Sequence, residues 1–481
     1  MSAPVLEPEV SAAWKTPRVE LGPAFLVKDI LPPEAQPPGA GVEGPGPMRL
    51  VDFEGRVYFT VTSPLLVETT LWRSDGTAPG TVPLLTVPES SPFSTSGIRE
   101  LTVAEDRLFF LVGGAAGDEE LWVSDGTGPG TRRLRGFSFP LGLTAVGDTL
   151  FLFDFALGRP QELWKSDGTV SGTVLVRSFG SGFSVSSLAT AAGGKLFFLV
   201  SDVEHGGELW VSNGTASGTR LVEDIFPGPT SAEPSDLTEA GGELYFSAQD
   251  PEHGRELWKS DGTRKGTRLV ADLSPGAASS DVNVLTENDH RLYFTLGAPA
   301  GVSGLLLYKV RVDGSCHHRP VRVAHIPDDF VNDPDFSPPV VTQATATGGK
   351  LFFIVEYLFL ADTPLEVQLW VTNGTDPGTK PLSDALFARE FLPSASLAPV
   401  GDGRVVFSAF DGEHGVEPWV SDGTPRGTRL LQDLVPGSGS SFPLELTHSD
   451  GFIFFVANTP ETGNELWAIP LRPRSHRTAG R

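Results

Sequence analysis

Acidic or amide residues followed by glycine recur along the chain and are the first candidates for chemistry. Five are aspartates and two are asparagines: Asp75, Asp125, Asp167, Asp261, Asp422, Asn213 and Asn373. Carboxylates and backbone carbonyls suit calcium, so a ring of calcium sites is one interpretation. The other is turn chemistry, because Asp and Asn before Gly tolerate left-handed backbone and cap nearby amides, and asparagine keeps that geometry without the charge. We favour turn chemistry and expect no bound metal.

A bulky aromatic residue recurs at nine positions and stands three residues before each of these seven turns. The nine are Trp72, Trp122, Trp164, Trp210, Trp258, Tyr308, Trp370, Trp419 and Trp467. Such rings could stack on sugars, as in lectin propellers, or they could pack between sheets. A tryptophan at one fixed strand position is typical of packing, and a tyrosine in the same place is expected if bulk matters most. We predict that the nine aromatic residues are structural.

Histidines offer a third candidate chemistry. His205, His253 and His414 recur in Asp-x-Glu-His-Gly turns, and residues 316–318 read Cys-His-His. Either group could ligate a metal, but histidines on separate repeats are expected to lie far apart, and the Cys-His-His segment supplies at most two well-placed ligands. We interpret both as solvated turns. No nucleophile elbow, zinc-binding His-Glu-x-x-His pattern or phosphate-binding glycine loop occurs, so we predict no catalytic residue and no cofactor.

The elements that carry these residues are repeats. The block Glu-Leu-Trp-Lys-Ser-Asp-Gly-Thr at residues 256–263, followed by Gly266-Thr267, returns with small variations along the chain. A degenerate copy at Tyr308 and a truncated one at Trp467 bring the number of copies to nine. Successive aromatic positions differ by 42 to 62 residues, a period in the range of propeller blades rather than of short helical repeats.

One repeat, residues 231–278, predicts four strands. They are expected at 235–240, 244–248, 256–259 and 268–273, separated by glycine-rich or polar turns. The second strand is apolar at consecutive positions, which is typical of a strand covered on both faces. Such a sheet must stack on similar sheets, and radial stacking is the common solution for four-stranded units of this length. We therefore predict an all-β fold, a nine-bladed β-propeller of four-stranded antiparallel blades.

The two ends of the chain predict how the ring closes. Residues 25–30 match the fourth-strand pattern of residues 221–225, while the last repeat stops after Trp467 without a fourth strand. We expect the N-terminal strand to complete the last blade and so remove the free sheet edges. Residues 13–16, Ala-Trp-Lys-Thr, also resemble the third-strand block. The alternative is therefore that the segment before Phe25 is a relic that competes with the Trp467 segment for the place of the third strand.

Length and charge narrow the possible domain organisation and the possible classes of partner. The 481 residues form one predicted propeller domain at 25–471, with an N-terminal extension at 1–24 and a tail at 472–481. A net charge of −24 disfavours nucleic acid and anionic lipid as partners. With one cysteine, the chain has no internal disulfide. It contains no apolar run of membrane-spanning length and no visible signal peptide, and we expect a monomer.

The repeat block resembles that of the bacterial ELWxxDGT-repeat proteins over roughly residues 25 to 470. The wider pattern of Gly-Gly, an aromatic second strand and Glu-Leu-Trp is also similar to Kelch repeats, although Gly266-Thr267 stands where Kelch repeats have a tryptophan. The Kelch resemblance implies a binding scaffold. The ELWxxDGT resemblance implies an exported protein, in the periplasm or at the cell surface.

These observations predict a non-enzymatic repeat scaffold that binds a protein or glycan ligand through one propeller face. The first alternative is a carbohydrate-active enzyme, a hydrolase or lyase, with carboxylates converging at the channel mouth. The second is a purely structural protein of the cell envelope. An acidic segment at residues 328–335 lengthens one connection and is either a partner contact or a solvated insertion.

Overall fold

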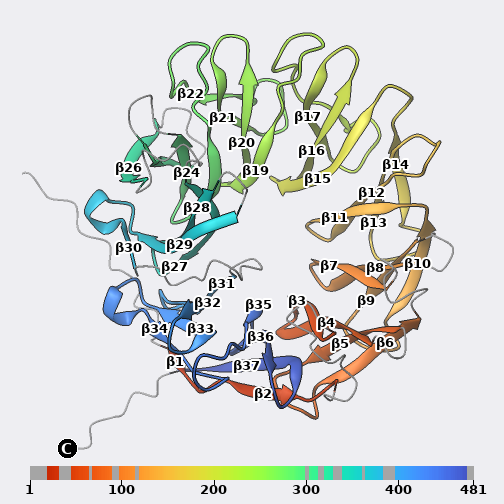
Figure 1. Cartoon of the computed structure of the whole chain (residues 1–481). Helices are drawn as coiled ribbons and strands as arrows, with labels where there is room; N and C mark the ends of the chain where they lie inside the picture. The colour runs from red at the N-terminus through yellow and green to blue at the C-terminus, as the bar shows by residue number, and fades with distance from the viewer. Residues whose placement is uncertain are drawn as a thin grey trace, which may run out of the picture.

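Nine antiparallel sheets follow one another around a common axis in the computed structural model (Figure 1). Eight have four strands, and the ninth joins strands from both ends of the chain. The prediction of an all-β, nine-bladed propeller is confirmed. The structure describes residues 19–31, 45–63, 68–88, 97–113, 119–297, 303–312, 319–328, 339–359, 363–382 and 396–473.

Each blade is a meander whose first strand faces the ring axis and whose fourth strand lies at the rim. Blades 1 to 3 contain β3 Pro47–Phe53, β4 Arg56–Ser63, β5 Glu68–Ser74 and β6 Val82–Pro88; β7 Ile98–Ala104, β8 Arg107–Gly113, β9 Glu119–Ser124 and β10 Arg132–Phe137; β11 Pro140–Val146, β12 Thr149–Asp154, β13 Glu162–Ser166 and β14 Val174–Ser178. Blades 4 to 6 contain β15 Ser184–Ala192, β16 Lys195–Asp202, β17 Gly206–Ser212 and β18 Arg220–Leu221; β19 Ser235–Ala240, β20 Glu243–Asp250, β21 Gly254–Ser260 and β22 Arg268–Ala271; β23 Asn283–Glu287, β24 Arg291–Gly297, β25 Leu305–Arg311 and β26 Val321–Ile326. Blades 7 to 9 contain β27 Val340–Thr347, β28 Lys350–Phe359, β29 Thr363–Thr372 and β30 Lys380–Pro381; β31 Leu397–Pro399, β32 Val405–Asp411, β33 Gly415–Ser421 and β34 Arg429–Leu430; β35 Leu444–Ser449, β36 Phe452–Thr459, β37 Gly463–Pro473 and, from the N-terminus, β2 Phe25–Lys28.

Blade 5 shows how the sequence pattern forms a blade. Its strands β19 to β22 coincide with the four predicted segments to within a few residues. In β20 the residues from Leu244 to Ala248 are all buried, although their side chains alternate between the two faces of the sheet. Both faces are therefore covered, because sheets flank this strand on either side.

The hydrophobic core is divided among the junctions between blades. The buried residues form nine clusters, and each cluster joins two neighbouring blades. At the junction of blades 4 and 5, for example, Phe197 and Val211 pack with Phe246 and Trp258. First strands also contact their neighbours at all nine junctions. A single blade therefore has no core of its own, and stability depends on a complete ring.

The ring is closed by the N-terminal segment. Strand β2 pairs with β37, with Leu26 opposite Trp467, and so supplies the fourth strand of blade 9. The prediction of an N-terminal strand in the last blade is confirmed. A further strand, β1 Val19–Leu21, pairs with the C-terminal end of β37. It lies within the segment that we predicted to be an N-terminal extension. Residues 13–16, which carry the relic alternative, lie outside the described residues.

Helix is nearly absent from the described chain. Two short 3-10 helices, Asp376–Gly378 and Pro425–Gly427, lie in turns between third and fourth strands. In the described ranges no helix has the length and apolarity needed to cross a bilayer.

Candidate functional site

The Asp-Gly turns join third to fourth strands and are capped by their own side chains. In blade 5 the Asp261 carboxylate accepts hydrogen bonds from Thr263 N and from Thr263 Oγ1, each at 2.7 Å. Ser260 Oγ and Thr267 Oγ1 lie 2.7 Å apart and close the base of the turn. Asn213 caps its turn through the same two bonds. The cap needs an oxygen acceptor and no negative charge, as turn chemistry requires.

The two glycines of the turn are needed for different physical reasons. Gly262 has φ of +82°, and a Cβ there would lie 3.1 Å from the Lys195 side chain of the preceding blade. A Cβ on Gly266 would lie 2.1 Å from Asp261 Oδ1, so a side chain there would displace the cap. The first glycine therefore permits the backbone turn and the close approach of the blades, and the second leaves room for the aspartate.

The seven turns belong to seven different blades and do not gather into one site. Among the described residues no three His, Cys, Asp or Glu side chains are arranged to hold a metal ion. In each Asp-x-Glu-His-Gly turn the histidine pairs with the aspartate of the same turn. In the first of them, His205 Nδ1 lies 3.0 Å from Asp202 Oδ2. Hydrogen bonding to Asp202 raises the pKa of His205. Residues 313–318 and 329–338 lie outside the described residues, and with them the Cys-His-His segment and most of the acidic connection.

The aromatic residue of the repeat lies opposite a second-strand phenylalanine in eight blades, and opposite Leu152 in blade 3. Trp258 pairs with Phe246 across the sheet and is 9% exposed. Tyr308 of the degenerate repeat stacks on Phe294 with ring centroids 5.8 Å apart, a placement matched by Trp370 on Phe353 at 6.2 Å. In blades 3, 4 and 1 a cation of the preceding fourth strand covers the tryptophan, and the pairs are Arg135 with Trp164, Arg177 with Trp210, and Lys28 with Trp72.

Cationic side chains connect neighbouring blades at the Asp-Gly turns. A lysine or arginine of one blade donates a hydrogen bond to a backbone carbonyl of the turn in the next blade, and we call this contact the latch. Seven junctions have a latch, formed by Arg73 to Gly126, Arg132 to Gly168, Arg177 to Thr219, Arg220 to Gly262, Lys309 to Gly374, Lys350 to Asp422 and Lys28 to Thr81. At the junction of blades 5 and 6 the corresponding turn lies outside the described residues.

The seam between blades 8 and 9 departs from this pattern. Blade 9 is built from the two ends of the chain, so no Asp-Gly turn joins its third strand β37 to its fourth strand β2. Arg429 holds the same place after the repeat threonine as Arg220 of blade 4. Arg220 donates to Leu221 O at 3.1 Å and to Gly262 O of the next blade at 2.7 Å. Arg429 donates to Leu430 O at 3.3 Å and, in the described chain, has no partner across the junction.

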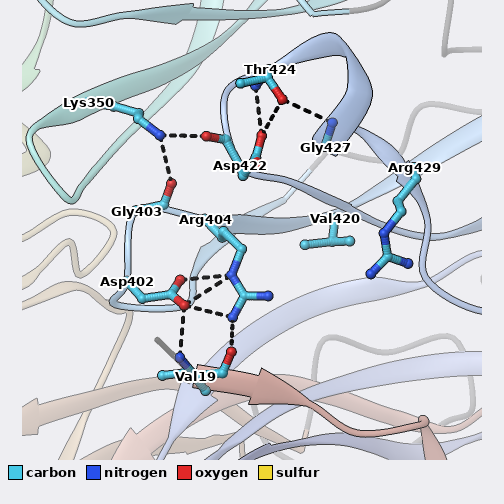
Figure 2. A pocket seen from close by; sticks show the side chains of 10 residues that line it. All are labelled: Val19, Lys350, Asp402, Gly403, Arg404, Val420, Asp422, Thr424, Gly427 and Arg429. Carbon is cyan, nitrogen blue, oxygen red and sulfur yellow. Dashed lines mark hydrogen bonds and ion pairs between the residues drawn. The ribbon is translucent and has the colours of Figure 1, made fainter. Parts of the chain in front are cut away.

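A pocket of about 380 Å³ lies at this seam. It is lined by side chains of blades 7 and 8 and by the first described residue of the N-terminal segment, including Val19, Lys350, Asp402, Arg404, Asp422 and Arg429. We call it the seam pocket. Figure 2 shows Arg429 on the side opposite Lys350, without a bond to the other lining residues.

An ion pair on the wall of the seam pocket holds the N-terminal segment. Arg404 donates to both carboxylate oxygens of Asp402, at 2.9 and 2.7 Å, and also to Val19 O (Figure 2). Asp402 accepts a hydrogen bond from Val19 N at 3.0 Å. Burial opposes ionisation of Asp402, but the bonds from Arg404 and Val19 outweigh it and lower the pKa of the carboxyl group. The pair is therefore charged at neutral pH.

The lining of the seam pocket is positive in a strongly acidic protein. Lys350, Arg404 and Arg429 contribute three positive charges, Asp402 and Asp422 two negative ones, so the sum is +1, whereas the chain carries −24. Both carboxylates are occupied, because Asp402 binds Arg404 and Asp422 caps Thr424. The cation left for a ligand is Arg429, whose planar guanidinium suits a carboxylate or phosphate.

Sequence reasoning missed a set of buried glutamates. Glu208, Glu256, Glu417 and Glu465 of the Glu-Leu-Trp blocks are 0% exposed and accept backbone N–H groups that follow the fourth strand. Burial raises the pKa of Glu208 and Glu417 to about 7 and that of Glu465 to about 8. The signal in the sequence is the Asp-Ile or Asp-Leu pair with a proline two residues later, which follows the fourth strand in these blades, as at residues 224–227.

Comparison with known proteins found similarity only to solved structures, at low sequence identity. No family model matches it, and no curated protein matches it. Solved structures that resemble it include the propeller domain of the Trilobed protease from Pyrococcus furiosus, at 12% identity and a TM-score of 0.35, covering 71% of this chain and 98% of that one. Prolyl oligopeptidase B from Galerina marginata resembles it at 10% identity and a TM-score of 0.43, covering 87% of this chain and 54% of that one. The chain spans about half the length of that peptidase.

These comparisons correct the predicted function. The solved structures named above are a peptidase and the propeller domain of a protease, whereas the sequence predicted a non-enzymatic scaffold for a protein or glycan. That prediction is wrong on this finding, and neither it nor its alternatives are carried further. At these identities the likeness concerns the fold and does not transfer a substrate or a catalytic residue.

Proposed function

We propose that the chain binds a small anion, bearing a carboxylate or phosphate group, in the seam pocket. The observation that carries the proposal is Arg429, which holds the place of the latch arginine Arg220 but faces blade 9, where no Asp-Gly turn is present because that blade is made from two chain ends. Elsewhere a latch arginine donates to a carbonyl oxygen, as Arg220 does to Gly262. An anionic oxygen in the seam pocket takes that place and forms a stronger, charge-assisted bond.

The charge of the pocket supports an anion over a cation or an apolar ligand. The formal charges of its lining residues sum to +1, and both of its carboxylates already accept hydrogen bonds from neighbouring residues. Lys350 donates to the carbonyl of Asp422 and, at 3.5 Å, to that of Gly403, so its ammonium group is fixed at the pocket wall. A fixed ammonium and a free guanidinium on opposite walls attract a small anion between them.

The test is titration of the intact chain with inorganic phosphate and with succinate, followed by isothermal calorimetry. We expect at least one of the two to bind the wild-type chain and Arg429→Gln to weaken that binding at least tenfold. Arg220→Gln is the matched control, because it removes the equivalent arginine of blade 4 and leaves the seam pocket intact. Its affinity for the anion is expected to match that of the wild-type chain.

Two results overturn the proposal. One is that neither anion binds the wild-type chain, and the other is that Arg429→Gln binds the anion as well as the wild-type chain does. Circular dichroism of each variant verifies the fold, which substitution of an exposed side chain such as Arg429 is expected to leave intact.

The repeat block of the chain resembles that of the ELWxxDGT-repeat proteins. We propose that the chain is a member of that group, that residues 25–471 form one domain and that it is a monomer. Light scattering tests the monomer. In the same way we propose that the seven turn residues and nine repeat aromatics are structural, which is supported by their caps and by the low exposure of Trp258.

A further inference from the structure

The N-terminal segment that closes the ring is held by side chains from three places. The Asp402–Arg404 pair binds both backbone groups of Val19. Gln432 binds Ala24 in the same two-sided way, accepting from Ala24 N at 2.8 Å and donating to Ala24 O at 3.3 Å. Glu465 accepts from Leu31 N at 2.6 Å. Closure therefore depends on two short strands, a few side-chain contacts and the packing of buried residues such as Val27.

The first of these contacts is also a wall of the seam pocket. Val19, Asp402 and Arg404 line the pocket, and Figure 2 shows the pair and the Val19 backbone at its lower side. If the N-terminal segment leaves, the pocket loses Val19, and Asp402 and Arg404 lose the groups that orient them. The complete pocket thus exists only in the closed ring.

We propose that anion binding in the seam pocket and docking of the N-terminal strand are coupled, so that each stabilises the other. The proposal rests on the proposed function above. A ligand that binds the closed ring better than the open one must favour closure by the ratio of its two affinities. The anion acts as a clamp on the joint between the two ends of the chain.

Hydrogen exchange of the full chain tests the coupling. At a phosphate or succinate concentration ten times the dissociation constant, amides of residues 19–31 should exchange about tenfold more slowly than without the anion. Residues 220–226 are the internal control. They follow the same pattern in blade 4, with Phe226 N bound to Glu208, but they lie at a junction whose latch is complete.

A variant outside the pocket tests the coupling from the other side. Gln432→Ala removes the contact with Ala24 without touching the pocket lining, and it should speed exchange of residues 19–31 and weaken anion binding severalfold. Gln249→Ala is the control, since Gln249 makes a similar bond to Ser231 O at 2.9 Å in another part of the ring.

The outcomes separate the two proposals. Absence of anion binding to the wild-type chain overturns the proposed function. Anion binding that Arg429→Gln removes, with unchanged exchange of residues 19–31, overturns the coupling and leaves the proposed function standing. Slower exchange of residues 19–31 and of residues 220–226 alike also overturns the coupling, because it shows general stabilisation.

Discussion

Blades 2 and 3 use the glutamate of the repeat differently from blades 4, 5, 8 and 9. In blades 2 and 3, Glu120 and Glu162 accept the indole N–H of the tryptophan two residues later, at 3.1 and 3.0 Å. In the other four blades the glutamate turns inward and binds backbone N–H groups. There the indole nitrogens of Trp210, Trp258, Trp419 and Trp467 are buried without a partner in the described chain.

The fourth strands explain the difference. Strands β10 and β14 of blades 2 and 3 have six and five residues, so their backbone groups continue to pair with the third strand. Strands β18 and β34 have two residues each. Beyond them the chain leaves the ladder, and its buried N–H groups need another acceptor. The side-chain oxygens of Glu208 and Glu417 fill that need. An identical residue thus acquires a different role because the fourth strand of its blade is shorter.

The greatest loss of stability is expected where the two kinds of blade differ most. Glu256→Ala leaves the N–H groups of Leu273 and Ser274 and the hydroxyl of Ser280 without their acceptor, and should destabilise the protein by about 3 kcal/mol or more. Glu162→Ala removes one bond to a tryptophan and should cost about 1 kcal/mol. Urea denaturation of both variants measures the difference. Equal losses would show that the two glutamates have the same role.

The second effect is a dependence of stability on pH that comes from one kind of blade. Burial raises the folded pKa of Glu465 from 4.5 to about 8, so the folded state holds this proton more tightly than the unfolded state. Its contribution to stability is complete below pH 4.5 and is lost as pH rises toward 8, by on the order of 1 kcal/mol per pH unit.

Glu465→Gln should therefore flatten the decline in unfolding free energy between about pH 5 and about pH 9. Glu162→Gln is the control and should keep the wild-type slope, because that glutamate is not among the buried acceptors. A Glu465→Gln slope identical to that of the wild-type chain would contradict the raised pKa.

The third and weakest effect concerns the turn that both kinds of blade share. Asp261→Asn should change stability by less than about 0.5 kcal/mol, because asparagine makes the same cap in two natural turns. Asp261→Ala removes the acceptor and should cost about 1 kcal/mol. Melting temperatures of the two variants measure the difference, and a loss for Asn as large as that for Ala would show that the cap needs the negative charge.

The sequence predicted the ring well, and the candidate site poorly. Nine copies, four strands per copy and closure by residues 25–28 were readable, because each follows from a pattern that the chain repeats. The function inferred from resemblance was wrong. Strand β1 and the buried glutamates were missed, since the partner of Glu465 stands 434 residues away at Leu31.

Some features of this protein depend on residues close together in the sequence, and others depend on residues that only the fold brings together. The Asp-Gly-Thr turn closes within eight residues through its own side chains, so the sequence alone determines it. The seam pocket joins Val19 to residues more than 300 positions away, and it lies where the ninth blade has no turn to offer Arg429. Only the closed ring brings those groups together, because their meeting depends on the number of blades and on which strands the two ends of the chain contribute.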